Sequence, residues 1–275
     1  MRVVCALALI GVCVARGLGV AHELAACGQI AVLFSDERWL PETERLVGEW
    51  MRVGARAAGH CALVHVWGER NASVCEWERV WCRPLRGTRD SHAWGGARYF
   101  ARIAQRLPRV LRLLLDLPTD VTRGVLVLDS DVVLWRDVAE RAARRTNASL
   151  VAQQEWPCQS APAYPCVNGG VWWARRTPAA ARLLGSAARL MRQLGVPDQD
   201  ALQVVAGRGS VRVWPRATHA NGWVVQHDAD FAVRDAHLAH ANWLRTYECK
   251  RLALAQLRAR RVVRVPPGCA SKARN

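Results

Sequence analysis

The segment from Val125 to Leu134 constrains the fold of this chain more than any other. Two aliphatic runs, Val125–Leu128 and Val132–Leu134, flank the tripeptide Asp129-Ser130-Asp131. A short, wholly apolar run fits a strand that is covered on both faces, as in a parallel sheet between layers of helices. Ligands bind such sheets beyond the carboxyl ends of their strands. The segment therefore predicts an α/β fold with two carboxylates at its ligand-binding edge.

The two carboxylates predict a metal site. Acids this close repel each other unless a cation lies between them, and hard divalent ions prefer oxygen ligands. Mg²⁺ or Mn²⁺ held by Asp129 and Asp131 would be placed to bind a diphosphate and neutralise charge on a leaving group. The simpler alternative is an acidic turn that ends a strand.

The rest of the chain alternates strand-like with helix-like segments. Strands are expected at residues 30–34, 62–67, 125–128, 150–152 and 170–173. Helices are expected from Pro41 onward, at 97–115 with a kink or break at Pro108, and at 178–194. Residues 68–96, rich in charge, Gly and Trp, are expected to form a long loop. This order predicts one α/β domain with a mostly parallel sheet flanked by helices.

The chain is strongly basic. Its 275 residues carry a formal net charge of +16, and Lys250 and Lys272 are the only lysines among the 39 basic residues. Residues 245–275 hold nine basic residues and one acid, a net charge of +8, which is half of the excess. Such a surplus predicts an anionic partner. The C-terminal part is expected to contact an acidic acceptor, a partner or a membrane surface.

The N-terminus and the cysteines indicate the secretory pathway. An apolar run at residues 3–15, then Arg16 and the small residues Gly19-Val20-Ala21, have the pattern of a signal peptide over residues 1–21. An uncleaved type II anchor and a buried N-terminal segment are the alternatives. Eight cysteines follow, an even number that favours disulfides. The short-loop pairs expected are Cys75 with Cys82 and Cys158 with Cys166.

Three later motifs carry further chemistry. Asn168-Gly169-Gly170 predicts a turn through which the backbone approaches a ligand closely, while Asn supplies an amide. Asp198-Gln199 lies at an expected helix start, where Asp198 is alternatively an N-cap. His240-Ala241-Asn242-Trp243 precedes Lys250; His can complete a site begun by two carboxylates, and Lys can hold a diphosphate. Trp172 and Trp173 are expected in the core rather than stacked on a sugar.

In this order, the motifs resemble the nucleotide-diphospho-sugar transferase family. This is the GT-A-fold group that contains the cell-wall and glycoprotein glycosyltransferases of family 77. The resemblance covers roughly residues 28–262. It implies a single GT-A, Rossmann-like domain at residues 22–262, followed by a basic tail at 263–275.

The resemblance also implies roles for particular residues. Asp131 and His240 would bind the metal directly, and Asp129 would contact the ribose or the water shell of the metal. Lys250 and, on the preceding helix, Arg109 would face the nucleotide diphosphate. Asn168, Gly170, Asp198 and Gln199 would line the donor sugar and the acceptor. The chain departs from the family pattern at Thr246 and Gly169, where the family commonly has Gly and Thr.

The expected function is therefore a metal-dependent, retaining glycosyltransferase. It would use Mn²⁺ or Mg²⁺ and a UDP-sugar, act on a glycan or glycoprotein acceptor in the secretory lumen, most often the Golgi, and bind no nucleic acid. Asp198 would act as nucleophile or position the sugar. Two alternatives stay open: a haloacid-dehalogenase-like phosphatase with Asp129 as nucleophile, and a non-catalytic binder of acidic polymers.

Overall fold

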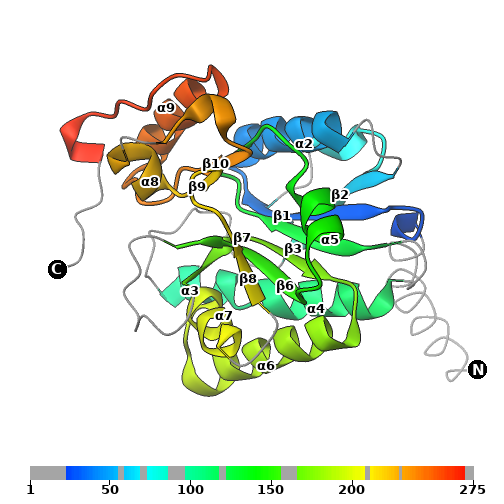
Figure 1. Cartoon of the computed structure of the whole chain (residues 1–275). Helices are drawn as coiled ribbons and strands as arrows, with labels where there is room; N and C mark the ends of the chain where they lie inside the picture. The colour runs from blue at the N-terminus through cyan, green and yellow to red at the C-terminus, as the bar shows by residue number, and fades with distance from the viewer. Residues whose placement is uncertain are drawn as a thin grey trace, which may run out of the picture.

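A seven-stranded sheet forms the centre of the computed structural model of the chain (Figure 1). The structure describes residues 23–54, 59–68, 73–85, 97–117, 122–155, 166–207, 211–228 and 231–269. The strand order is β3-β2-β1-β4-β7-β6-β8. The strands are β1 (Gln29–Asp36), β2 (His60–Trp67), β3 (Val80–Leu85), β4 (Gly124–Leu128), β6 (Leu150–Gln154), β7 (Val167–Arg175) and β8 (Val211–Trp214).

All neighbouring strands of this sheet pair in parallel except at β7, which runs antiparallel to both β4 and β6. The predicted mostly parallel sheet is confirmed. Leu128 at the end of β4 pairs with Val171 near the start of β7. The reversal of β7 therefore brings its first residues to the edge where β4 ends.

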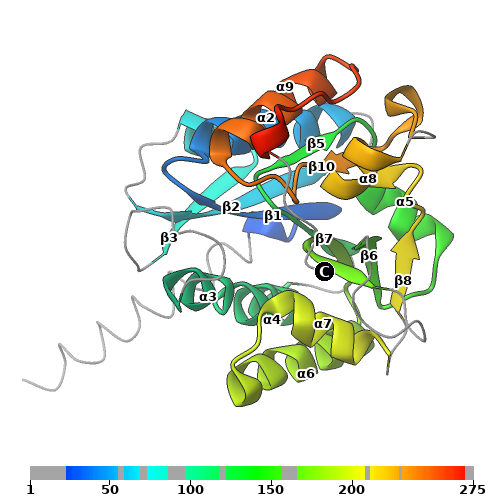
Figure 2. The same ribbon diagram turned by 90° about the vertical axis from the view of Figure 1, so that its left-hand side faces the viewer.

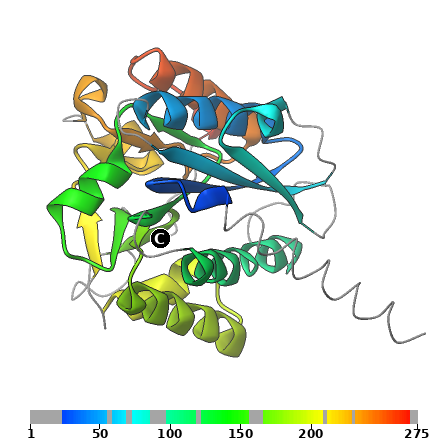
Figure 3. The same ribbon diagram turned by 90° about the vertical axis from the view of Figure 1, so that its right-hand side faces the viewer.

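Helices cover both faces of the sheet (Figures 2 and 3). On one face, α2 (Leu40–Gly54) and α5 (Val138–Arg145) bury their apolar sides against the strands. On the other face, α4 (Arg106–Asp116), α6 (Pro178–Leu194) and α7 (Asp198–Ala206) form a second core. The short helix α3 (Ala97–Ile103) precedes α4. Two cores on one sheet make this a three-layer α/β fold.

Local sequence sets the ends of α6, the helix that was predicted with its observed bounds. The Thr177 side chain caps the helix by accepting a hydrogen bond from the Ala180 N–H at 3.2 Å. Pro178 takes the first position, where no N–H is needed. Gly195 ends the helix in the left-handed region at φ 64°.

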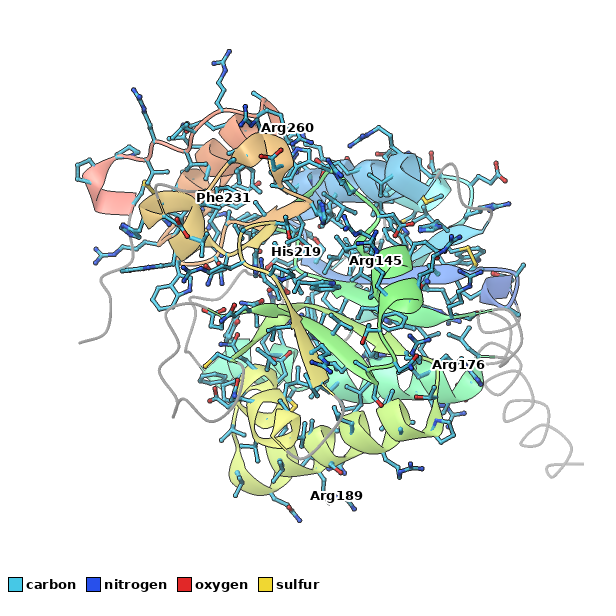
Figure 4. The ribbon with its side chains drawn as sticks, viewed as in Figure 1. Arg145, Arg176, Arg189, His219, Phe231 and Arg260 are labelled. Carbon is cyan, nitrogen blue, oxygen red and sulfur yellow. A yellow bond between two sulfur atoms is a disulfide. The ribbon has the colours of Figure 1, made fainter. Side chains whose placement is uncertain are left out.

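A three-stranded sheet of order β5-β10-β9 stands beside the ends of β4 and β6. It contains β5 (Val132–Leu134), β9 (His219–Ala220) and β10 (Leu238–His240), and it is followed by α9 (Tyr247–Arg258); α8 (Gly222–His227) lies between β9 and β10. His219 lies where the two sheets meet, with its ring stacked on Trp214 of β8 at 5.1 Å (Figure 4). A third core joins this sheet to α9.

Three predictions differ from the structure. Within residues 68–96, expected as loop, β3 extends the sheet, because Val80 to Leu85 pairs with Ala62 to Trp67. The helix break falls at Ala104–Gln105, and Pro108 lies in the first turn of α4, where a missing N–H costs nothing. Asn168-Gly169-Gly170 lies inside β7 rather than in a turn.

Other predictions concern burial and cysteines. Trp172 and Trp173 are fully buried in the two opposite cores, as expected. The predicted Cys75–Cys82 disulfide is confirmed, and Cys27–Cys61 and Cys249–Cys269 are also formed. The Cys158–Cys166 pairing involves Cys158, which lies outside the described ranges, as does the N-terminal leader. None of the described helices is long and apolar enough to cross a membrane.

Part of the C-terminal basic charge is used inside the fold. Arg258 at the end of α9 pairs with Glu49 at 2.8 Å and with the buried Glu42 at 2.5 Å, both on α2. Burial of the two glutamates requires a cation. The excess of basic residues in this region is therefore not all available to an external partner.

The buried His65 predicts that the folded protein loses stability in acid. Burial, with Arg109 and Arg83 nearby, lowers the pKa of His65 to about 3. As pH falls below about 6.5, the unfolded chain takes up a proton at this residue and the folded chain does not, at a cost of about 1.4 kcal/mol per pH unit. We expect His65→Phe, which keeps the stacking on Phe34, to remove about 2 kcal/mol of the stability difference between pH 7.5 and pH 5. Urea denaturation at both pH values measures the free energy of unfolding from which this difference is taken.

The matched control for this prediction is the exposed Leu194, which carries no titratable group. Leu194→Phe should leave the pH dependence of the unfolding free energy as it is in the unmodified chain. An undiminished pH dependence in His65→Phe would contradict the assignment.

Candidate active site at the carboxyl edge of the sheet

Two carboxylates and an imidazole meet beyond the end of β4. Asp129 follows β4, Asp131 precedes β5, and His240 ends β10. The His240 Nε2 lies 3.0 Å from Asp131 Oδ1 and 3.7 Å from Asp129 Oδ2. One ligand atom from each residue lies within 4.8 Å of the others. The three residues selected from the sequence as metal ligands are thus brought together.

Strand pairing explains how His240 reaches acids more than a hundred residues earlier in the chain. β10 runs antiparallel to β5, so that His240 pairs with Val132, the residue after Asp131. The Ala241 N–H donates to the Asp131 carbonyl at 2.8 Å. The small sheet therefore fixes the backbones of both ligands.

A glutamine orients the His240 ring. The Gln153 amide nitrogen donates to the carbonyls of Ala220 and His219, at 2.8 and 3.3 Å. Its Oε1 must then accept a hydrogen bond, and it lies 3.1 Å from His240 Nδ1. The network therefore assigns a proton to Nδ1 and turns Nε2 toward the carboxylates, as in metal-binding histidines whose second nitrogen is held by a neighbour.

Gly170 leaves the space that this cluster needs. A Cβ at position 170 would lie 2.1 Å from Asp129 Oδ2 and 2.7 Å from His240 Cε1. Any side chain there would displace two of the three ligands. The sequence predicts that the backbone at Gly170 closely approaches a ligand. In the structure this backbone closely approaches the Asp129 carboxylate.

The charges at Asp131 are closely balanced. Burial alone would raise the pKa of Asp131, but Lys250, whose Nζ lies 2.5 Å from Oδ2, and His240 outweigh it and hold that pKa well below its usual range. Burial opposes protonation of His240, whereas Asp131 raises the pKa of the ring above its ordinary value. The ionised Asp131 is therefore stabilised by positive charge from two sides.

Arg106 forms the second half of the site and was missed from the sequence. This buried guanidinium lies 2.9 Å from Asp129 Oδ1 and 3.5 Å from Asp198 Oδ2, and it donates to the Gly169 carbonyl at 3.1 Å. A signal was present: Arg106 shares the apolar face of α4 with Val110 and Leu113. The predicted Arg109 is exposed on α4, with Gln105 as its hydrogen-bond partner, and it does not join the cluster.

The remaining predicted residues converge on the start of β7. Asp198 is the first residue of α7 rather than its N-cap, and its carboxylate faces Arg106. Gln199 Oε1 accepts a hydrogen bond from the Gly169 N–H at 3.0 Å, and Asn168 Oδ1 accepts one from the Gly170 N–H at 2.8 Å. These contacts attach the helix to the strand beside the carboxylates.

The pKa of Asp198 separates it from Asp131. Burial raises the pKa of Asp198 to about 6; Arg106 opposes this shift and Asp129 adds to it. Asp131 is therefore ionised at every working pH, whereas Asp198 changes charge near pH 6. Two carboxyl groups with pKa values this far apart are suited to different roles.

Two further residues were given no role from the sequence. Glu155, just after β6, is buried and accepts hydrogen bonds from Asn168 Nδ2 and from the Trp243 indole N–H. Thr246 caps α9 by accepting a hydrogen bond from the Cys249 N–H at 3.2 Å. It thereby fixes the start of the helix that carries Lys250.

The same fold occurs in solved glycosyltransferases. The galactosyltransferase LgtC, in complex with donor and acceptor sugar analogues, aligns with a TM-score of 0.57 and 13% identity over 86% of this chain and 98% of its own. A glycosyltransferase involved in glycosylation of the major capsid of PBCV-1 aligns with a TM-score of 0.53 and 15% identity, over 84% of this chain and 99% of its own. The bifunctional glycosyltransferase WbbM aligns with a TM-score of 0.55 and 13% identity, over 78% of this chain and 46% of its own.

These alignments establish the fold: the chain is a single domain of the GT-A type. No family model matches the sequence, and no curated protein matches it. The relation is therefore one of three-dimensional structure, at identities too low to assign a specific family.

The space at Gly170 leads to a test of the site. Gly170→Ala should weaken binding of Mn²⁺ at least tenfold, because the methyl group displaces Asp129 and His240. Isothermal titration calorimetry measures this affinity. Gly185→Ala is the matched control, since its Cβ on α6 would make an ordinary 3.7 Å contact with Leu111 Cδ2. Equal Mn²⁺ affinity in both variants would contradict the site.

Proposed function

We propose that this protein is a metal-dependent glycosyltransferase that moves a sugar from a UDP-sugar to a glycan or glycoprotein acceptor with retention of configuration. One observation carries the proposal. In a fold shared with solved glycosyltransferases, Asp129, Asp131 and His240 converge at the carboxyl edge of the sheet around the space that Gly170 leaves open. The Asp129 and Asp131 pair by itself does not determine where His240 lies, so its presence beside them is an independent observation.

The donor set fits Mn²⁺ or Mg²⁺. Two carboxylates and one imidazole, with Nε2 turned inward by Gln153, are ligands that Mn²⁺ accepts readily, and the carboxylates also suit Mg²⁺. A bound divalent ion would supply charge to hold the donor diphosphate and to stabilise the leaving group. Asp129, Asp131 and His240 would hold it.

Strand order supports the position of the nucleotide. β1 and β4 are neighbours, but the chain leaves β1 toward β2 on one side and returns from β3 to β4 on the other, so their carboxyl ends form a topological switch point, where sheets of this kind bind ligands. Asp36, the last residue of β1, lies at this switch point, and Arg102 pairs with it at 3.0 Å. Lys250, beside Asp131, supplies a mobile positive charge for the phosphates.

The chain's own residues orient the reacting groups. Arg106 holds Asp198 and Asp129 at fixed positions on either side of its guanidinium. Asp198 is then placed to accept a hydrogen bond from the donor sugar or to attack it, and Gln199 and Asn168 hold the adjacent backbone of β7. In a front-side route, the acceptor hydroxyl attacks from the side of the departing UDP, whose phosphate oxygen takes the proton.

The other functions that the sequence left open receive less support. A haloacid-dehalogenase-like phosphatase that uses Asp129 as nucleophile is less supported because the fold is shared with solved glycosyltransferases. A binder of acidic polymers needs no buried carboxylate cluster. For location we propose the secretory lumen, supported by the three disulfides whose cysteines both lie in the described ranges and by the leader-like N-terminal sequence.

Removal of a ligand carboxylate tests the function. Asp131→Asn should lower Mn²⁺-dependent UDP release from a panel of UDP-sugars at least about a hundredfold, because it removes a direct ligand. EDTA should lower the activity of the unmodified protein similarly. The exposed Asp235 gives the control Asp235→Asn. Failure of the unmodified protein to turn over any UDP-sugar would refute the proposed function.

The pKa of Asp198 predicts the pH profile. If the ionised form acts, kcat/KM for donor turnover should rise as pH increases through about 6. In Asp198→Asn this limb should disappear and the residual rate should be low and flat. An acid limb that persists unchanged in the variant would assign it to another group.

A further inference from the structure

Two tryptophans that the proposed function does not use are linked to the strand beside the carboxylate cluster through Glu155 and Asn168. Trp243 is three residues after His240, and Trp223 is on α8. Their rings meet edge to face, with centroids 5.8 Å apart and planes at 67°. Both side chains are half-buried, unlike Trp172 and Trp173, which are fully buried. Aromatic surface is therefore kept partly accessible next to the site.

The backbone of Trp243 is strained. Its φ of 65° lies in the left-handed region, which is unfavourable for a bulky side chain by about 1–3 kcal/mol. Such strain persists where the surroundings enforce it, and it concentrates at functional sites. Glu155 enforces it here: the Trp243 indole N–H donates to Glu155 Oε1 at 2.6 Å.

A close backbone contact joins the two tryptophans into one unit. A Cβ at Gly222, the residue before Trp223, would lie 1.7 Å from the Asn242 carbonyl oxygen. The Gly222 N–H donates to Asn242 Oδ1 at 2.7 Å. The start of α8 is therefore held directly against the residue that precedes Trp243, and the pair is preorganised.

Hydrogen bonds connect this unit to the catalytic edge. The second oxygen of Glu155 accepts from Asn168, whose own Oδ1 accepts from the Gly170 N–H. Along the chain, three residues span at most about 11 Å between the Cα atoms of His240 and Trp243. The backbone of Trp243 is thus at most about 11 Å from that of His240, and its ring contacts the ring of Trp223.

We infer that Trp223 and Trp243 form the acceptor surface of the enzyme, against which the apolar face of a pyranose ring packs. One face of such a ring presents C–H groups, whereas its hydroxyls lie at the rim, and half-buried indole rings match this pattern. Glu155 is a positioning residue that holds Trp243. The inference rests on the proposed glycosyl transfer and specifies its acceptor: a glycan presenting a C–H face.

The test separates acceptor use from donor use. With Mn²⁺ and a UDP-sugar, the ratio of transfer onto methyl glycosides to donor hydrolysis should fall about tenfold in Trp243→Ala and in Trp223→Ala, mainly through a higher KM for the glycoside. The half-exposed Trp77 gives the control, Trp77→Ala, which should leave the ratio unchanged. An unchanged ratio in both test variants would overturn the inference.

A double-variant cycle tests the positioning role. The Glu155 carboxylate accepts hydrogen bonds from Asn168 and Trp243, and Glu155→Gln replaces it with an amide whose NH₂ group cannot accept. It should raise the KM for the glycoside in the unmodified background but have little further effect in Trp243→Ala, because it acts through that ring. Additive effects would assign Glu155 to another role.

Saturation-transfer NMR with the methyl glycosides distinguishes failure of the inference from failure of the proposed function. Signals from the ring C–H protons should appear with the unmodified protein and weaken in both tryptophan variants, whether or not any donor turns over. Signals equally strong in the variants would refute the acceptor surface. Absence of donor turnover with intact, tryptophan-dependent signals would refute the transferase while retaining the sugar-binding surface.

Discussion

The concentration of carboxylates at one edge of the sheet is the constraint on which the site depends. Asp131 and Asp198 are buried and Asp129 is half-buried, and isolated carboxylates in such surroundings are costly. Each one faces a cation: Asp131 faces Lys250 and His240, and Arg106 bridges Asp129 and Asp198. These bases come from α4, β10 and α9, so the elements around the sheet are tied to one electrostatic centre.

The reversed strand β7 makes this centre compact. Had it run parallel to β4, its first residues would lie at the opposite edge of the sheet. Because it is antiparallel, Asn168 and Gly170 stand beside Asp129, whose N–H donates to the Gly170 carbonyl at 2.7 Å. Gly170 is not needed to turn the chain, because neither it nor Gly169 has a positive φ. Its missing Cβ gives the carboxylate and the imidazole their space.

The prediction of the fold from sequence succeeded where the signal was local. The apolar run at Val125–Leu128 and the capped, amphipathic segment at 178–194 each identify an element through its own composition. β3 was missed because its Arg83 and Pro84 suit an edge strand and not a buried one. Asp129, Asp131, His240 and Lys250 were selected through the order of their motifs, and the structure brings their side chains together. Arg106 lies at helical spacing with the buried Val110 and Leu113, but its partners Asp129 and Asp198, like those of Glu155, are distant in sequence.

By itself, the sequence determined the class of fold, the edge at which the site lies and the residue types that form it, because burial periodicity and ligand chemistry are properties of short segments. Only the tertiary structure decided which groups meet. The antiparallel pairing of β10 with β5 brings His240 to Asp131, and the packing of α4 brings Arg106, rather than Arg109, to the carboxylates. Contacts of this kind depend on strand order and helix rotation, which are set by the packing of the whole chain at once.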